Sequence, residues 1–438
     1  MFQLFSREVK PEEWQRFALY TRRVRALHFE TLYEEAVHST VWTYLHEYFL
    51  DARMLPRLET LDIAGLSPRN LTPLTLLLAP GIQSLWIIFE RGMTVTLHPS
   101  EKPAGAAVLS AISRTCPGLR TLYLGHPFPV TMTGASILAS LKELTKLVLC
   151  QCKWCAISDV EPLCTHPLAA SLRVLKIAVK DIPASFSTDV LPVLDTLSVQ
   201  GPSEDINNFV RGIQPISLQK FTMMARRGYG DPPTPAHLES ICDQLPSSLS
   251  SFKLIICEGR YGDPANSQKC ELSAIVAQMR PLKNVTTLTL RGEWTAIIMD
   301  INGIRTLGEL CPHLKSLTVT YTGIVPTHLA NVTPSGLAEV ARCCPALTSL
   351  SLSRLDASEL LLPEIDISIM SHGLQFLEFQ EVQGSALPDP AIVARAVTRL
   401  FPRLKLDTRS DSNEGVWSGE WQGDWERVRA LFYTGMSG

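Results

Sequence analysis

The sequence predicts an α/β solenoid with a horseshoe shape, in which parallel strands line the concave face and helices lie outside. Three observations favour this fold: an apolar pattern that recurs along the chain, helical stretches between its copies, and a composition typical of ordered protein. The chain has 438 residues, of which 45% are hydrophobic and 19% charged. That much apolar surface can offset the entropy lost on folding, so the composition excludes a disordered chain.

The recurring pattern is an apolar residue, two variable residues, an apolar residue, one variable residue and an apolar residue. The clearest copies are Leu119–Leu124, Leu144–Leu149, Leu314–Val319 and Leu347–Leu352. Looser copies begin at Val24, Leu58, Ile82, Leu172, Leu194, Leu218, Leu249, Val285, Leu374 and Phe401. The fourteen copies are spaced by about 29 residues on average, at the long end of the range for leucine-rich repeats.

Each copy predicts one short strand, because its last two apolar residues are two positions apart and point to the same face. Such a strand cannot bury its leucines alone, so neighbouring coils must stack. Apolar residues at helical spacing predict helices at 106–112, 272–279, 304–310, 337–341 and 392–400. Several of these stretches end in Cys-Pro, which places proline just beyond the helix.

The two ends differ in composition from the repeats and divide the chain into three parts. Residues 10–22 read as an amphipathic helix that starts at Pro11, so we expect residues 1–23 to form an N-terminal helical cap or linker. The leucine-rich-repeat domain is expected at 24–406. Residues 407–438 are expected to form a loop and a capping helix, with Trp417, Trp421 and Trp425 packing against the last coil.

Charge and cysteine content indicate the cellular setting. Forty basic and 43 acidic side chains give a net charge of −3, which favours binding to neither nucleic acid nor membrane surfaces. The eleven cysteines are scattered, and the N-terminus has no apolar segment of signal-peptide length. No apolar run is long enough to span a bilayer. We therefore expect a reduced protein in the cytoplasm or nucleus.

One cysteine cluster could hold a metal ion. Cys150, Cys152, Cys155, Cys164 and His166 offer soft ligands of the kind that zinc prefers. The cluster has one Cys-x-x-Cys pair and lacks a second, so buried cysteines of the coil are the expected reading, and a metal-dependent site is the alternative. The sequence contains no phosphate-binding loop, nucleophile elbow or His-Glu-x-x-His motif. We expect neither enzymatic activity nor a cofactor.

The residues between the paired leucines should face the concave side, where a protein partner would bind. Trp86, Tyr123 and Val148 fall on consecutive coils and form an aromatic and apolar patch, with Ile88 beside it. The full expected partner-binding set is Trp86, Ile88, Tyr123, Val148, Lys176, Lys253 and Arg291. In the alternative reading, Trp86 is covered by a loop, and the many Ser and Thr residues of the later coils only reflect strand propensity.

Two segments near the N-terminus resemble fungal F-box/leucine-rich-repeat proteins. They are Glu13–Phe17 with Tyr20–Leu27, and Leu55–Leu61, and the repeated Cys-Pro-x-Leu-x-x-Leu-x-Leu pattern fits the same family. The resemblance implies that the repeats present a protein substrate to a cullin-type ubiquitin ligase, to which the F-box helices are joined through a Skp1-like adaptor.

The F-box itself is missing from the expected place. Only nine residues precede Lys10, and they contain no Leu-Pro-x-Glu helix. Either the sequence is truncated ahead of this point or the chain has lost its adaptor-binding module, so binding to a Skp1-like adaptor is in doubt. The alternative is a free-standing leucine-rich-repeat regulator that acts by occluding a partner.

Overall fold

The computed structural model describes most of the repeat region and falls into two compact units. The described residues are 10–30, 39–49, 53–66, 71–89, 102–125, 136–149, 164, 167–187, 191–227, 237–258, 268–293, 295–322, 332–361, 372–383 and 390–404. Unit 1 comprises residues 1–201 and 208–218, and unit 2 comprises residues 202–207 and 219–438. Each unit is described below by itself.

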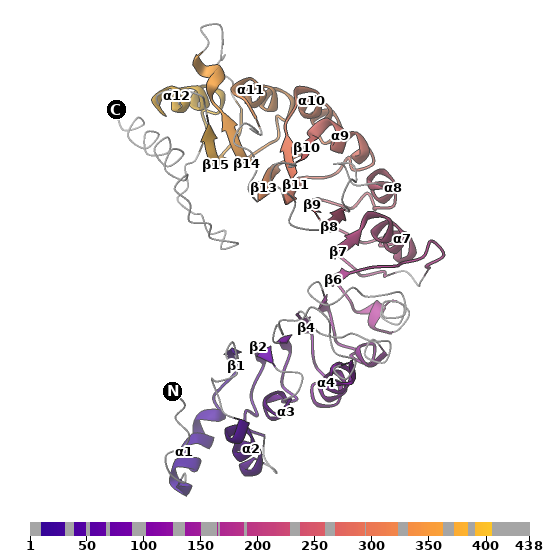
Figure 1. Ribbon diagram of the computed structural model, residues 1–438, viewed down its shortest axis with the longest axis vertical. Helices are drawn as coiled ribbons and strands as arrows, with labels where there is room; N and C mark the ends of the chain where they lie inside the picture. The colour runs from indigo at the N-terminus through magenta and orange to yellow at the C-terminus, as the bar shows by residue number, and fades with distance from the viewer. Residues whose placement is uncertain are drawn as a thin grey trace. The chain divides into compact units, whose positions relative to one another are not determined.

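Unit 1 is built on a parallel sheet whose strands follow one another in chain order (Figure 1). The strands are β1 (Ala26–Glu30), β2 (Thr60–Leu66), β3 (Ser84–Phe89), β4 (Thr121–Leu124), β5 (Lys146–Leu149), β6 (Val174–Ala178) and β7 (Thr196–Pro202). Each pairs with the next in parallel. Parallel neighbours require a crossover segment between them, and here most of these segments contain helices.

The helices of unit 1 lie beside its strands in Figure 1. They are α1 (Pro11–Thr21), α2 (Ser39–Tyr48), α3 (Thr72–Leu77), α4 (Lys102–Thr115), the 3₁₀ turn η2 (Pro167–Ala170) and α7 (Ser203–Ile213), whose first residues belong to unit 2. The expected helix at 10–22 is present as α1. Its buried Trp14 stacks on Tyr48 of α2 at 3.8 Å between ring centroids and meets Phe49 edge-on. Helix α1 therefore packs on α2, which the sequence pattern did not predict.

Unit 2 repeats the same arrangement with longer strands. Its main sheet contains β8 (Lys220–Arg227), β9 (Ser251–Glu258), β11 (Thr287–Glu293), β13 (Ser316–Thr322), β14 (Ser349–Asp356) and β15 (Phe376–Gln383), all parallel. Its helical segments are α8 (Leu238–Asp243), α9 (Leu272–Val276), η4 (Ala277–Met279), α10 (Ile301–Leu310), α11 (Pro334–Cys343), η5 (Ser358–Leu361) and α12 (Pro390–Leu400). The predicted fold class, an α/β leucine-rich-repeat solenoid with parallel strands, is confirmed.

The core of each unit is a ladder of apolar side chains in register. In unit 1 the rungs are Leu27, Leu61, Leu85, Leu122, Leu147, Leu175 and Leu197. In unit 2 they are Phe221, Phe252, Leu288, Leu317, Leu350 and Leu377. From Leu61 to Leu350 these side chains are at most 1% exposed. Each rung removes apolar surface of its neighbours from water, so stability depends on stacking rather than on any single coil.

Backbone and cysteine hydrogen bonds join successive coils. The amides of Lys315 and Ser316 both donate to the carbonyl of Thr286, at 2.8 and 3.0 Å, and the same doubled contact recurs from coil to coil. At the helix ends, the thiol of Cys116 donates to the carbonyl of Ala79 and that of Cys311 to the carbonyl of Leu282, at 3.3 and 3.4 Å. In these two Cys-Pro pairs the cysteine thus satisfies a carbonyl of the preceding coil.

The remaining sequence predictions can be compared with the structure where the residues are described. The helices expected around 106, 272, 304, 337 and 392 are all present, as α4, α9 with η4, α10, α11 and α12. A short parallel pair, β10 (Gln268–Glu271) with β12 (Thr295–Ile298), was not predicted. The fourteenth copy continues past residue 404, and residues 407–438 with Trp417, Trp421 and Trp425 lie outside the described residues. Within the described chain, no helix is both long and apolar enough to cross a membrane.

Candidate protein-binding surface

The pleat of each strand separates core residues from surface residues. On β3, Leu85 and Ile87 are fully buried, whereas Trp86 between them is 42% exposed. Strand pairing aligns the equivalent positions into one line across the sheet, the central row of unit 1. It consists of His28, Asp62, Trp86, Tyr123, Val148, Lys176 and Ser198. The row lies on the face opposite the leucine ladder.

An aromatic pair occupies the middle of this row. The rings of Trp86 and Tyr123 stack with centroids 3.7 Å apart and planes inclined by 22°. Such stacking holds both rings in place before any partner arrives. Trp86 is one of the large apolar side chains that the described surface leaves exposed. The pair therefore offers a rigid aromatic contact area on a strand surface.

The other apolar residues expected in the patch are less accessible. Val148 follows Tyr123 in the row but is only 5% exposed, so it adds almost no contact area. The expectation that Val148 offers a contact surface is therefore wrong for this structure. Ile88 is half-buried, and a Cβ placed on Gly125 would lie 2.7 Å from its Cγ1. The absence of a side chain at Gly125 leaves the space that Ile88 occupies beside the aromatic pair.

Charged side chains flank the aromatic pair. On the side of β1, His28 Nδ1 lies 2.7 Å from Asp62 Oδ2, and Arg25 lies 2.5 Å from Glu59. On the side of β5 and β6, Lys146 is exposed and Lys176 is half-buried. These exposed pairs contribute little to stability, because water and salt screen them. They add polar groups around the aromatic centre, as the rim of a protein interface requires.

Unit 2 has a central row of a different character. It consists of Thr222, Lys253, Thr289, Thr318, Ser351 and Glu378. Arg291 lies two residues beyond Thr289 on β11, in register with Ile255 and Thr320. Both cationic residues expected here, Lys253 and Arg291, are half-buried. This surface is rich in hydroxyls and positively charged at its centre.

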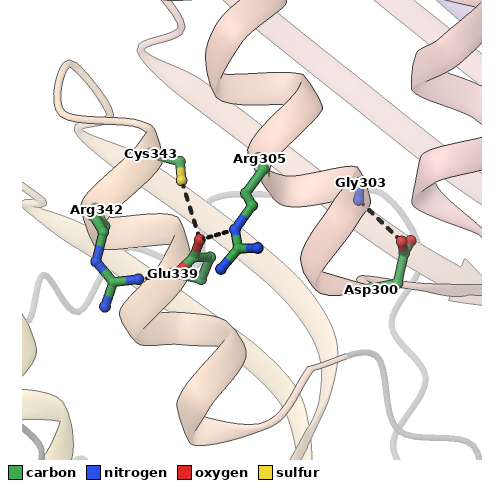
Figure 2. Close-up of polar contacts among 6 residues, drawn as sticks. All are labelled: Asp300, Gly303, Arg305, Glu339, Arg342 and Cys343. Carbon is green, nitrogen blue, oxygen red and sulfur yellow. Dashed lines mark hydrogen bonds and ion pairs between the residues drawn. The ribbon is translucent and has the colours of Figure 1, made fainter.

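The most buried acidic group of the described residues lies among the helices instead and was missed by sequence reasoning (Figure 2). Glu339 of α11 has a side chain that is 7% exposed, and its Oε1 accepts a hydrogen bond of 2.6 Å from Arg305 Nε of α10. Arg342 and the thiol of Cys343 also contact this carboxylate. The hydrogen bond from Arg305 holds the pKa of Glu339 below its usual range. The residues are 34 positions apart, about one repeat, and this spacing was the available signal.

This cluster is suited to joining helices rather than to catalysis. A carboxylate kept ionised by two guanidinium groups cannot act as a general acid near neutral pH. Beside it, Asp300 caps α10 by accepting from the amide of Gly303 at 2.9 Å, and it also accepts from the amide of Ser273 at 2.9 Å. Both carboxylates therefore connect neighbouring coils on the helical side of unit 2.

All of the described cysteines except Cys343 are buried, and burial makes their thiols poor metal ligands. Burial raises the pKa of the thiols of Cys116 and Cys311 to about 11 and that of Cys344 to about 12. Thiolate is the form that binds metals, so these thiols disfavour a metal site. No potential metal-binding cluster occurs among the described residues. Of the cysteine cluster considered for zinc, Cys164 is buried, while Cys150, Cys152, Cys155 and His166 lie outside the described residues.

Comparisons with known proteins give limited information. No protein-family model matches the sequence, and no curated protein matches it. One similar solved structure is the leucine-rich repeat-containing protein LegL7 from Legionella pneumophila, with 10% identity and a TM-score of 0.33 over 86% of this chain and 99% of that one. Another is the Rad7 and Elc1 complex in yeast, with 14% identity and a TM-score of 0.37 over 83% of this chain and 94% of that one. At these identities and scores, neither supports an assignment of function.

Proposed function

We propose that this protein is a non-enzymatic scaffold that binds a protein partner on the strand face of unit 1. The observation that carries the proposal is the stacked pair of Trp86 and Tyr123 on β3 and β4, in which Trp86 is exposed and Tyr123 is half-buried, although the strand residues on either side of them are fully buried. Tryptophan and tyrosine are the residue types that contribute most to interface energies. Their ring positions are already fixed in the stack, so binding costs little further side-chain entropy.

The role that fits best is recognition of a protein substrate for a cullin-type ubiquitin ligase. Support comes from the resemblance of Glu13–Phe17, Tyr20–Leu27 and the Cys-Pro repeats to F-box/leucine-rich-repeat proteins. In this role, Trp86 and Tyr123 anchor the substrate, and Lys176 contributes at the rim of the contact.

Affinity capture from cell extract tests both levels of the proposal. The wild-type protein is compared with Trp86→Ala/Tyr123→Ala. The control is Ile216→Ala, because Ile216 is 60% exposed in unit 1 and belongs to none of its strands. We expect a stoichiometric partner with the wild type and the control, and its loss with the double variant. A thermal melt of each variant verifies that the protein remains folded.

The identity of what is recovered separates the roles. Skp1-like adaptor and cullin subunits among the captured proteins support the ligase role. A different stoichiometric partner without them leaves the scaffold in place and favours a regulator that acts by occlusion. If the folded double variant captures the partner as well as the wild type, the proposed surface is wrong.

A further inference from the structure

A second candidate site lies on the strand face of unit 2 and does not involve Trp86 or Tyr123. Lys253 of β9 and Arg291 of β11 are on adjacent strands, and Arg291 is in register with Ile255, two residues beyond Lys253. Residues two apart on a strand share a face, so the two cationic side chains are diagonal neighbours. Both are half-buried.

Arg291 has a hydrogen-bond donor with no acceptor. Its Nε is buried, and in the part of the chain that the structure describes no acceptor lies within hydrogen-bond distance. Buried donors in folded proteins nearly always have a partner, so an unpaired one calls for a group that the polypeptide itself does not supply. A guanidinium group presents its donors in a planar fork that matches the oxygen atoms of a phosphate or carboxylate.

Hydroxyl groups surround the two cations. Thr289 is in register with Lys253 on one side and Thr318 on the other, and Thr320 is in register with Arg291. All three threonines are half-buried. Threonine hydroxyls can donate to oxyanions while remaining uncharged. Two cations and three hydroxyls therefore converge on one small area of the sheet.

The charge balance of this area is positive. Arg226 of β8 and Glu293 of β11 are both in register with Cys257 on β9. Glu293 lies two residues beyond Arg291 on the same strand. The carboxylate of Glu293 is engaged by the thiol of Cys257. Lys253 and Arg291 together outnumber this one acidic group, so an anionic ligand is favoured over a cationic one.

We propose that this area, the oxyanion site formed by Lys253, Arg291, Thr289, Thr318 and Thr320, binds a phosphorylated serine or threonine side chain of a protein partner. A phosphate ester carries about two negative charges and three acceptor oxygens, which suits two cations and several hydroxyls. The site lies on an open strand face where hydroxyl positions continue through Ser316 and Ser349. These positions can contact the polypeptide on either side of the phosphorylated residue. Free phosphate has no such polypeptide, so the extra contacts favour a phosphorylated protein over the free ion.

Binding to immobilised peptide libraries tests the proposal. The probes are degenerate nonapeptides whose central residue is fixed as phosphoserine, serine or glutamate, and retention of the purified full chain is measured. We expect retention on the phosphoserine library at least tenfold above that on the serine library. Arg291→Met and Lys253→Met, which keep the aliphatic stems, should each abolish the difference, while Arg291→Lys should reduce it.

Lys315→Met serves as the matched control, since Lys315 is an exposed lysine outside the site. This variant should be retained on the phosphoserine library as strongly as the wild type. Trp86→Ala/Tyr123→Ala should be retained equally, which keeps this test separate from the test of the proposed function. Lys253→Met remains informative even where Arg291→Met impairs folding, as judged by circular dichroism. Equal retention on all three libraries, absence of retention, or an equal loss in Lys315→Met would each overturn the proposal. Competition by inorganic phosphate as strong as that by free phosphopeptide would assign the site to a free anion instead and overturn the peptide ligand.

Discussion

Replacing Leu317 by alanine should destabilise unit 2 far more than replacing its neighbour Thr318. Leu317 is fully buried between Leu288 and Leu350, which are at most 1% exposed, whereas Thr318 is half-buried on the opposite face. Removing about three carbon groups from the core costs about 2.4 kcal/mol in transfer free energy alone. Because both neighbouring rungs are fixed by their own coils, the cavity should remain open, and we expect a total of about 3–4 kcal/mol. Thr318→Ala should cost less than about 1 kcal/mol.

Urea unfolding followed by circular dichroism measures both values, and hydrogen exchange of β13 amides checks them locally. The local measurement is needed because stacked repeats can lose two-state behaviour. A cost below about 1 kcal/mol for Leu317→Ala would refute the ladder, given the 2.7–5.0 kcal/mol range of buried leucines. An equal cost for both variants would refute the assignment of the two faces.

Three further outcomes follow from the structure. Because the pKa of Glu339 is lowered in the folded protein, its ionised carboxylate stabilises the fold fully above the ordinary carboxyl pKa of 4.5. The stability difference between wild type and Glu339→Gln should therefore be constant from pH 6 to 8 and shrink as the pH falls below 4.5. Thermal melts in which this difference grows on acidification would contradict the prediction. Gly292→Ala should destabilise unit 2, since its Cβ would lie against the carbonyl oxygen of Thr295, and a melting temperature equal to that of the wild type would count against this close approach. Burial raises the thiol pKa to about 11, 11 and 12 at Cys116, Cys311 and Cys344. These thiols should therefore resist iodoacetamide at pH 7.5 in the native protein and react in urea. Mass spectrometry that finds them modified under native conditions would show that they are accessible.

The rungs could be predicted from sequence because each leucine is specified by its own coil. The positions between paired leucines, from His28 to Ser198 and from Thr222 to Glu378, align across the strands as the repeat pattern predicts. The strands β10 and β12 could not be predicted, because they lie outside the repeat and depend on the close approach of Gly292 to Thr295. The packing of helix α2 was missed because its Tyr48 and Trp42 contact Trp14 and Phe29, which are far from them in the sequence.

The candidate sites were less predictable, since exposure depends on neighbouring side chains. Trp86 and Val148 occupy equivalent strand positions, yet one is 42% and the other 5% exposed. The contact of Glu339 with Arg305 required knowing which helices lie side by side. Likewise, the unpaired Nε of Arg291 is a property of atomic positions that no residue pattern encodes.

Site-specific photo-crosslinking tests the central claim most directly. A benzoylphenylalanine residue replaces Tyr123 in one protein and Tyr20 in another; Tyr20 is 56% exposed and lies on helix α1 rather than on a strand. After irradiation in cell extract, the account predicts a discrete adduct with a single protein partner from position 123 and none of that mass from position 20. An adduct from position 20 alone, or the same adduct from both positions, would contradict partner binding on the strand face of unit 1.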